Sequence, residues 1–484
     1  MGYTALRVRD TPSKLPHDLP HLPHFGGGQP EWNSARAQRV LGRRENPFER
    51  TRLPGTHERV AARGARDSRT GNTPFESPML STVRRAQRDS GHKSRVERRF
   101  SVMAKRVWIL GAGFSQPLGG PLLKDLFRLE THDSCIATFP SVFPDLANHL
   151  FCLQIVFHWG REQGGYWEDA EEFLSFVDDA YAGNDTIKRE KLKAVVGAAY
   201  RPHWHEGHRG LKIRDIVSNP QPFLDALDRI ARRALAAECE RFLFHRSPSE
   251  DEAWSPFVKW AKSLSATTDA VITFNYDRVL EMLDPAGTSL QVLLPDQTKD
   301  DKRVPVYRLH GGVSWELQEG RILHSDDPLA LLKSPQAQIA IAAPGSGKTH
   351  FVARHLEDLW KRAEKHLSEA ETVFFVGYSF PKSDAEALRR ILDVLKLKAG
   401  APPHRDIHLV LGAETTTATR RIAALLQTCT AGRCLEVVPP EAPFDSHRNT
   451  IGRPDQLLRI KQHPLWTQDF LGDWQDRAKP IPLA

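Results

Sequence analysis

Four short motifs in the sequence hold residue types that could bind a nucleotide or move a proton. In chain order they are Gly111-Ala112-Gly113-Phe114-Ser115, Thr273-Phe274-Asn275-Tyr276-Asp277, Arg308-Leu309-His310-Gly311-Gly312 and Gly377-Tyr378-Ser379-Phe380-Pro381-Lys382-Ser383-Asp384. Each motif follows or ends an apolar run that is typical of a buried strand. Because the carboxyl ends of parallel strands meet at one edge of a sheet, we expect the four motifs to converge there.

The first motif has the composition of a turn that binds a pyrophosphate. Small residues let the backbone turn sharply and approach an anion, and the N–H groups at the start of the following helix point toward it. The third glycine of the common dinucleotide fingerprint is missing, and Ser115 stands in that region. We predict that Gly111, Ala112, Gly113 and Ser115 cradle a pyrophosphate. A tight strand-to-helix turn without a ligand is the alternative.

The later motifs supply the candidate catalytic residues. Asn275 can position a water molecule and a ribose hydroxyl, and His310 can act as general base, an effect typically worth about 10² to 10⁴ in rate. The predicted nucleotide-binding residues in these motifs are Thr273, Asp277, Gly377, Ser379 and Asp384. Each motif also has a structural explanation, since Asp and Ser commonly cap helices and turns and a lone histidine is often only packed.

The elements that must position these motifs are typical of an α/β protein. Strand-like apolar runs are separated by longer helical patterns from residue 105 onward, which indicates a parallel sheet. The predicted strands are 106–110, 270–274, 304–309, 338–342, 372–376 and 407–411. Residues 130–265 have helical periodicity at 168–181, 222–244 and 253–264, and no comparable strand. We predict a Rossmann-like sheet with a large helical insertion beside it.

Charge divides the chain into two parts. Residues 1–102 hold 20 basic and 10 acidic residues, a net charge of +10, whereas the remainder holds 47 and 50, a net charge of −3. The first part lacks periodicity and large apolar side chains, which predicts a disordered basic arm, or a segment upstream of a natural start at Met103. Within the chain, only this arm has the basic composition that is weakly indicative of nucleic-acid binding. The predicted domain is 103–435, followed by a tail, 436–484, with a short helix at 465–474.

Composition excludes several other classes. No apolar run approaches the roughly 20 residues that a membrane helix needs, and residues 1–30 have no apolar core of a secretory signal. The cysteines are five and scattered, at Cys135, Cys152, Cys239, Cys429 and Cys434. Their spacing matches no zinc pattern, so we expect no metal and a reduced, cytoplasmic location.

The order of the four motifs resembles the sirtuin-like (silent information regulator two) family over about residues 104–435, with Asn275 and His310 as the most diagnostic pair. Within that family it is most similar to a bacterial NAD-consuming branch. The paired Cys-x-x-Cys zinc module of the protein deacylases is missing, and Phe274 stands where deacylases prefer Gln. The resemblance therefore implies an NAD hydrolase that releases nicotinamide and ADP-ribose, used by bacteria to deplete NAD during phage infection.

Such an activity has to be controlled, because free NAD hydrolysis kills the cell that makes the enzyme. The sequence shows no sensor domain, so we expect control by self-assembly into a homo-oligomer or by a separately encoded partner, such as a ring-forming ATPase or a nucleic-acid-guided protein.

Two alternatives to an NAD hydrolase remain open. The first is a catalytically silent NAD or ADP-ribose binding module that recruits a partner. The second is a P-loop ATPase, because residues 342–349 end in Gly347-Lys348-Thr349 and nearly match a phosphate loop. Against it, the first position is Ala342, and neither of the later predicted strands ends in the acidic residue that would hold magnesium.

Overall fold

The computed structural model of this chain describes most of the sequence that follows the basic arm. The described residues are 105–127, 153–181, 185–200, 221–244, 246–334, 336–343, 347–381, 384–396, 404–413, 416–428, 434–438 and 457–477. The arm predicted at residues 1–102 lies outside them, as do residues 344–346 of the stretch that nearly matches a phosphate loop.

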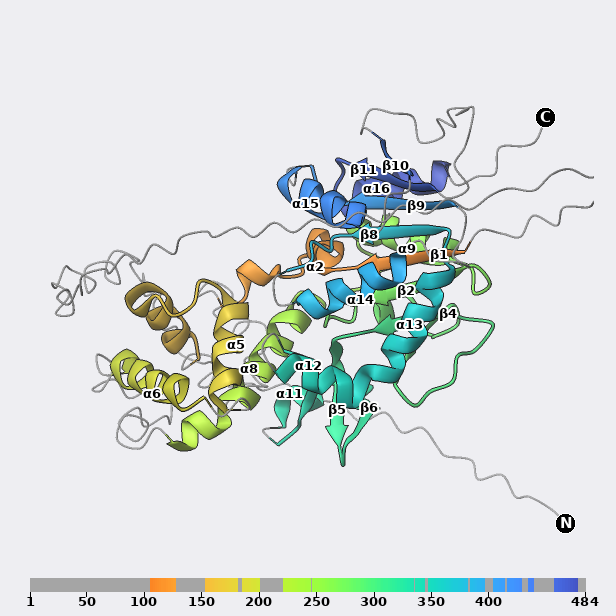
Figure 1. Cartoon of the computed structure of the whole chain (residues 1–484). Coiled ribbons are helices and arrows are strands. Elements are labelled where there is room, and N and C mark those ends of the chain that lie inside the picture. The colour runs from red at the N-terminus through yellow and green to blue at the C-terminus, as the bar shows by residue number, and fades with distance from the viewer. Residues whose placement is uncertain are drawn as a thin grey trace, which may run out of the picture. The chain divides into compact units, whose positions relative to one another are not determined.

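An eight-stranded sheet forms the centre of the described unit, and all of its strand pairs are parallel. The strands are β1 (Arg106–Leu110), β2 (Asp269–Thr273), β3 (Leu290–Leu293), β4 (Val304–Arg308), β8 (Thr372–Val376), β9 (His404–Val410), β10 (Cys434–Val438) and β11 (Leu457–His463). Their order is β10-β11-β9-β8-β1-β2-β4-β3 (Figure 1). The Rossmann-like α/β fold predicted from the sequence is confirmed.

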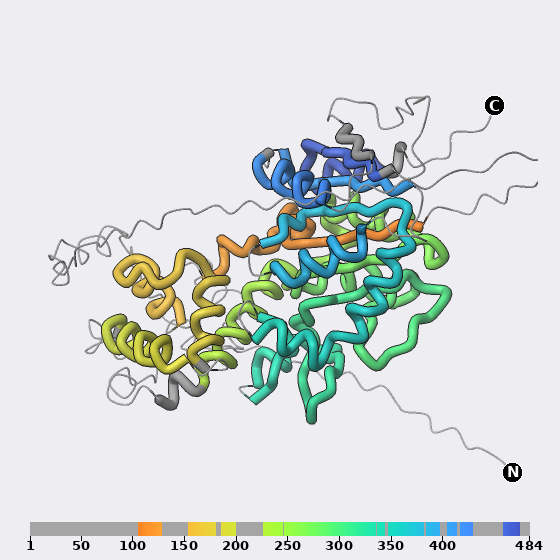
Figure 2. The backbone as a smooth tube through the Cα atoms, viewed as in Figure 1, coloured from red at the N-terminus to blue at the C-terminus, as the bar shows by residue number. Residues whose placement is uncertain are grey.

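The register of this sheet places the four motifs in one row. Leu110 at the end of β1 pairs with Thr273 on one side and with Val376 on the other. Thr273 in turn pairs with Arg308 at the end of β4. In Figure 2, β1 is flanked by segments from the middle and from the later part of the chain, so motifs more than 100 residues apart become neighbours.

Helices cover both faces of the sheet because the strands carry apolar residues on both sides. Val107 and Ile109 face the layer of α13 (Glu357–Glu369), α14 (Ala385–Leu395) and α15 (Thr416–Gln427). Trp108 and Leu110 face α9 (Ser255–Ser263), α10 (Val279–Leu283) and α16 (Thr467–Arg477). On this second face Trp108 stacks on Phe374 with ring centroids 4.0 Å apart.

The helical insertion between β1 and β2 is confirmed. Its longer described helices are α5 (Ala170–Tyr181), α6 (Thr186–Tyr200) and α8 (Gln221–Arg241), and a π-helical turn covers Gly160–Gly164. These helices share an apolar core with a second, three-stranded sheet, in the order β6-β5-β7. That sheet consists of β5 (Gly311–Gln318), β6 (Arg321–His324) and β7 (Ile339–Ile341), and α11 (Pro328–Lys333) follows β6.

One predicted strand has a different place from the one expected. The run predicted at 338–342 is β7, which pairs antiparallel with β5 and does not join the parallel sheet. A short apolar run does not reveal the direction of its partner. The chain leaves β4 and turns at Gly311, whose φ is +76° and whose absent Cβ would lie 1.9 Å from the Ala340 carbonyl oxygen. This turn starts β5 and creates the second sheet.

The sheet continues beyond residue 435, where the sequence suggested that the folded domain ends. β10 spans that position, and β11 lies between β9 and β10. The short helix expected at residues 465–474 is α16, and its Phe470, Leu471 and Trp474 are buried against β1 and β8. In the part of the chain that the structure describes, no helix is both long enough and apolar enough to span a bilayer.

Candidate functional site

The glycine turn after β1 packs directly on the turn after β8. Gly111 N–H donates to the Val376 carbonyl and Gly113 N–H to the Gly377 carbonyl, each at 3.0 Å. A Cβ on Gly111 would lie 2.6 Å from Tyr378 Cα, and one on Gly113 would lie 2.7 Å from Gly377 Cα. The two glycines are therefore required by close backbone packing, and two of the amides that the sequence suggested for a pyrophosphate are bonded within the protein.

Gly377 completes the contact from the opposite side. Its φ is +65°, and a Cβ there would lie 2.2 Å from Phe114 N. A side chain at this position would be strained by the backbone conformation and would also collide with α2 (Ala112–Ser115), the short helix that holds Ala112 and Ser115. The turn of β1 and the turn of β8 thus interlock through three glycines.

Ser115, Asn275 and Asp277 form a buried polar group. Ser115 Oγ donates to Asp277 Oδ2 at 2.6 Å, and Asn275 Nδ2 donates to Ser115 Oγ at 2.9 Å. Because the single hydroxyl proton goes to Asp277, Ser115 must accept from the amide. The Asn275 Nδ2 therefore faces Ser115, and its Oδ1 is left to accept a hydrogen bond from a ligand.

Two further contacts fix this group. Thr273 Oγ1 accepts from Asn275 N at 3.1 Å, so Thr273 shapes the backbone of the second motif. Asp277 Oδ1 accepts from Val279 N at 3.1 Å, in the first turn of α10. Burial raises the pKa of Asp277, although the bonds from Ser115 and Val279 oppose this shift. Asp277 thus holds Ser115 and also supports a helix start, which combines the two roles that the sequence left open.

Arg308 was not predicted as a site residue. It holds the backbone of Asp277 through a hydrogen bond to the Asp277 carbonyl. Its side chain is fully buried, and its NH2 donates to the Asp277 carbonyl at 2.8 Å and to Glu281 Oε2 at 2.7 Å. A Cβ at Gly312 would lie 2.3 Å from Arg308 NH1, so that glycine makes room for the guanidinium. A charged residue in the apolar run 304–309, followed by two glycines, was the signal available in the sequence.

His310 belongs to a second buried group with Asp384, Lys348 and Tyr378. His310 Nε2 lies 3.7 Å from Asp384 Oδ1, and the Lys348 ammonium is ion-paired with that same oxygen. Tyr378 OH donates to Asp384 Oδ2 at 2.6 Å. Burial and then the Lys348 charge lower the pKa of His310 to about 3, against the opposing carboxylate of Asp384. The imidazole is therefore neutral at physiological pH.

Asp384 is the charged centre of this second group. Burial alone would raise its pKa, but His310, Lys348 and the hydroxyl of Tyr378 together hold the pKa below its ordinary value. Asp384 is only 4% exposed and both of its oxygens have partners within the protein. A bound nucleotide, for which the sequence suggested Asp384 as a ligand-binding residue, would have to share these oxygens with their present partners or displace one of them.

The Phe274 ring packs against the second group. Phe274 stacks on Tyr378 with ring centroids 4.2 Å apart, and its ring lies 4.8 Å from that of His310. Within the described residues, no hydrogen bond or ion pair connects Asn275 with His310. The two predicted catalytic residues thus follow neighbouring strands and belong to separate polar groups.

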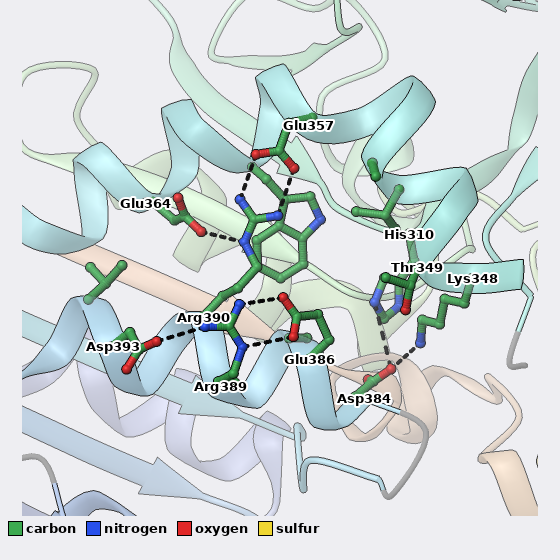
Figure 3. Close-up of a pocket in the computed structure, with 15 residues that line it drawn as sticks. His310, Lys348, Thr349, Glu357, Glu364, Asp384, Glu386, Arg389, Arg390 and Asp393 are labelled. Carbon is green, nitrogen blue, oxygen red and sulfur yellow. Dashed lines mark hydrogen bonds and ion pairs between the residues drawn. The ribbon is translucent and has the colours of Figure 1, made fainter. Parts of the chain in front are cut away.

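A cavity of about 510 Å³ opens on the His310 group. His310, Lys348 and Asp384 line one end of it, and the rest is lined by side chains of α12 (Gly347–Phe351), of the π-helical turn that follows α12, of α13 and of α14 (Figure 3). Arg390 binds Glu357 and Glu364 and lies 4.5 Å from the Trp360 ring, while Arg389 binds Glu386 and Asp393. The volume lies within the range of about 300–1,000 Å³ that is usual for small-molecule sites.

Ser379 lies apart from both polar groups. Ser379 is exposed. Its backbone carbonyl accepts a hydrogen bond from Arg421, which also donates to the Phe380 carbonyl at 2.7 Å. The structure therefore places Ser115, Asn275 and Asp277 in one group and His310 and Asp384 in another. It adds Arg308 to the first group, and Lys348 and Tyr378 to the second.

The phosphate-loop alternative is not supported by the surroundings of Lys348. The preceding strand, β7, belongs to the antiparallel sheet, whereas a phosphate loop follows a strand of a parallel one. The first residue of α12 (Gly347–Phe351), Gly347, donates its N–H to Asp178 of α5, and the Lys348 ammonium is bound to Asp384. A π-helical turn, Val352–Leu356, then leads from α12 into α13.

The residues that the structure describes contain no group of three or more His, Cys, Asp or Glu side chains that could hold a metal ion.

Comparison with known proteins agrees with the resemblance noted in the sequence. Residues 269–429 match the family model described as SIR2-like domain, a range that contains Asn275, His310 and Asp384 and begins after the glycine turn of β1. No curated protein matches the chain.

Two solved structures are similar to the chain at 12% sequence identity and a TM-score of 0.27. One is Sir2 in complex with the inhibitor EX-527, 2'-O-acetyl-ADP-ribose and a deacetylated p53 peptide, with 77% of this chain and 93% of that chain covered. The other is titled "The Structural basis for Sirtuin Substrate affinity", with 77% and 92% covered. A likeness of this strength carries no conclusion about the site.

Proposed function

We propose that this protein binds NAD and hydrolyses its nicotinamide glycosidic bond, releasing nicotinamide and ADP-ribose. The observation that carries the proposal is the placement of an oriented carboxamide, Asn275, and a neutral imidazole, His310, just after the ends of the adjacent strands β2 and β4. The match of residues 269–429 to the SIR2-like domain supports the same substrate.

Each residue has a defined part in the proposed reaction. Departure of nicotinamide leaves positive charge on the ribose, so the site must hold the sugar and direct water to its anomeric carbon. Asn275 Oδ1, whose direction is set by Ser115, accepts a hydrogen bond from that water or from a ribose hydroxyl. His310 accepts the proton that the water or the hydroxyl gives up, and no prior loss of a proton is needed because the imidazole is neutral.

The role of the glycine turn in this proposal is narrower than the sequence suggested. Gly111, Gly113 and Gly377 hold β1 against β8, and this places Ser115 where it can orient Asn275. Any contact of the turn with a pyrophosphate would use amides other than those of Gly111 and Gly113, which are bonded to the Val376 and Gly377 carbonyls.

We further propose that the activity depletes NAD in bacterial defence against phage, in the cytoplasm, and that a homo-oligomer or a separately encoded activator controls it. Light scattering on the purified protein tests the assembly part, because a strict monomer with constant activity contradicts it. Cellular NAD content after induction, with and without phage, tests the defence role.

The experiment that tests the activity follows nicotinamide release from NAD by the full chain. Asn275→Ala and His310→Ala are compared with His324→Ala, which removes an exposed imidazole on β6. We expect loss of about 10² to 10⁴ in kcat for the His310 variant and no change for the control. NAD binding without release by the wild-type protein, in every assembly state, would instead support the silent binding module.

A further inference from the structure

In the second polar group, two basic side chains lie near the same carboxylate oxygen. The Lys348 ammonium is ion-paired with Asp384 Oδ1, while His310 Nε2 lies 3.7 Å from the same oxygen. At that separation the imidazole makes no effective hydrogen bond to the carboxylate. His310 and Lys348 therefore compete for one acceptor, and in this structure the lysine holds it.

We propose that Lys348 is a positioning residue that weakens His310 as a general base by occupying Asp384, and that the rate of the enzyme rises when the ammonium leaves this oxygen. The inference rests on the proposed NAD hydrolysis and adds its control. With Lys348 displaced, Nε2–H of His310 donates to Asp384 Oδ1, so the carboxylate orients the ring and stabilises the imidazolium formed when the other nitrogen takes a proton. Asp384 stays ionised throughout, and no group other than His310 gains the proton.

The resting arrangement explains why such a contact is needed. A base with a pKa of about 3 is a weak proton acceptor at neutral pH, since an effective general base has a pKa near the working pH. After burial, the charge of the Lys348 ammonium is the next largest cause of this low pKa. Its removal takes away one repulsive charge and frees one attractive charge, and both changes make the imidazole more basic.

The other charged and titratable groups around His310 come from several elements, among them Glu171 of α5 and Arg232 of α8, whose charges act on Tyr276. Tyr276 follows β2, with its ring centroid 6.3 Å from that of His310, and Tyr378 follows β8 and is bonded to Asp384. Glu357 and Glu364 of α13 are paired with Arg390 of α14, and Glu386 is paired with Arg389. Because these carboxylates already have partners, the contact between Lys348 and Asp384 is the ion pair of the cavity that bears directly on His310.

The helical insertion holds the start of the helix that carries Lys348. Gly347 N–H donates to Asp178 Oδ2 of α5, and a Cβ on Gly347 would lie 2.6 Å from Asp178 Oδ1. The lysine is thus anchored at its backbone by the insertion and at its ammonium by Asp384. A shift of α5, caused by assembly or by a bound activator, would pull Gly347 and release the ammonium from the site.

The test compares Lys348→Met, which removes the charge, with Lys348→Arg, which keeps it. Lys361→Met is the matched control, because Lys361 is an exposed lysine of α13 that forms a 3.9 Å ion pair with Asp358 in its own helix. We expect Lys348→Met to raise kcat for nicotinamide release about 10-fold or more. We expect Lys348→Arg and Lys361→Met to stay close to the wild-type rate.

The pH profile and the titration of His310 supply readouts that a merely structural lysine would not move. In Lys348→Met, the acidic limb of the kcat profile should move to higher pH than in wild type and Lys348→Arg, because one of the two causes that lower the pKa of His310 is gone while burial remains. Proteins labelled with ¹³C in the histidine rings report the titration directly, and His310→Gln identifies the resonance. An unchanged His310 titration in Lys348→Met overturns the inference, whatever the rate.

The two proposals can fail separately. If no variant releases nicotinamide, the NAD hydrolase proposal fails, whereas the His310 titration still decides whether Lys348 controls the imidazole. If Lys348→Met does not fold, Asp178→Ala takes its place, because loosening Gly347 should shift the same titration upward by a smaller amount. A folded Asp178→Ala protein with the wild-type titration counts against the inference.

Discussion

The hydroxyl of Ser115 donates to Asp277 across 162 positions of the sequence, at an oxygen-to-oxygen distance of 2.6 Å. This bond joins the turn after β1 to the turn after β2 and uses the only proton that Ser115 has. The Asn275 amide can then meet Ser115 only as a donor, so one hydrogen bond decides which way the neighbouring side chain presents its oxygen.

Replacement of Ser115 by alanine should therefore reduce catalysis more than stability. We expect kcat/KM for NAD to fall about 10-fold, the equivalent of one hydrogen bond of about 1.4 kcal/mol, because Asn275 loses its orientation. Nicotinamide release measures the effect, and urea unfolding checks that the fold survives. Ser249→Ala, which removes an exposed hydroxyl, is the control, and an unchanged kcat/KM in Ser115→Ala would show that the orientation does not matter.

His310 should make the protein sensitive to acid. Its pKa is about 3 in the folded chain and near 6.5 when unfolded, so the unfolded state binds the extra proton first and stability falls as the pH drops from 6.5 toward 3. One titrating group can lower the free energy of unfolding by at most about 1.4 kcal/mol per pH unit. His310→Gln should flatten this dependence in urea unfolding at pH 7, 6 and 5, and the exposed His324→Gln should not. Equal slopes for the two variants would exclude His310 as the source.

Glu238 should have the opposite pH dependence. Burial raises the pKa of this α8 carboxyl to about 8, although both of its oxygens lie 3.1 Å from Phe127 N. Since the folded state keeps a proton that the unfolded state loses, stability falls as the pH rises from about 4.5 to 8. Glu238→Gln keeps an acceptor for Phe127 N–H. Its free energy of unfolding should rise relative to that of wild type by up to about 1.4 kcal/mol per pH unit over that range. Unfolding at pH 5 and pH 8 measures the difference, and a constant one would be inconsistent with the buried neutral carboxyl.

The glycine contact between β1 and β8 should be intolerant of a methyl group. Gly113→Ala puts a Cβ 2.7 Å from Gly377 Cα, and we expect the free energy of unfolding to fall by about 1–3 kcal/mol. Gly197→Ala in α6 is the control, because a Cβ there meets no atom within 4 Å and alanine is the better helix former. The free energy of unfolding of Gly197→Ala should rise by about 0.5–1 kcal/mol. Similar losses in both proteins would mean that the close approach is not the cause.

The sequence was sufficient to predict the centre of the sheet and the strands that the four motifs follow. The runs at 106–110 and 372–376 are apolar after their first residue and are followed by glycine, as is common for buried parallel strands. That Ser115 bonds to Asn275 and Asp277 was not predicted, because Ser115 lies far from the other two in the sequence. The strand β11 was missed because Arg459, Lys461 and His463 alternate with its apolar residues and hide the run.

The second polar group depended on contacts that no local pattern contains. Lys348 stands in a stretch that nearly matches a phosphate loop, and only the folded structure brings its ammonium to Asp384, the residue before α14. Arg308 is buried in β4 because Glu281 and the Asp277 carbonyl, both from the segment after β2, meet its guanidinium.

The position of β11 in the sheet has a consequence for how the protein is made. β10 has its sheet neighbour only in β11, which is synthesised after it, and Thr467 of α16 donates to the Gly113 carbonyl at 2.9 Å. During translation the glycine turn therefore lacks its hydrogen bond to Thr467 until α16 has been synthesised. The edge of β9 that pairs with β11 likewise remains unpaired until residues 457–463 leave the ribosome. A nascent chain stalled before residue 457 should thus be readily cleaved by protease near β9, and the emergence of α16 should protect it.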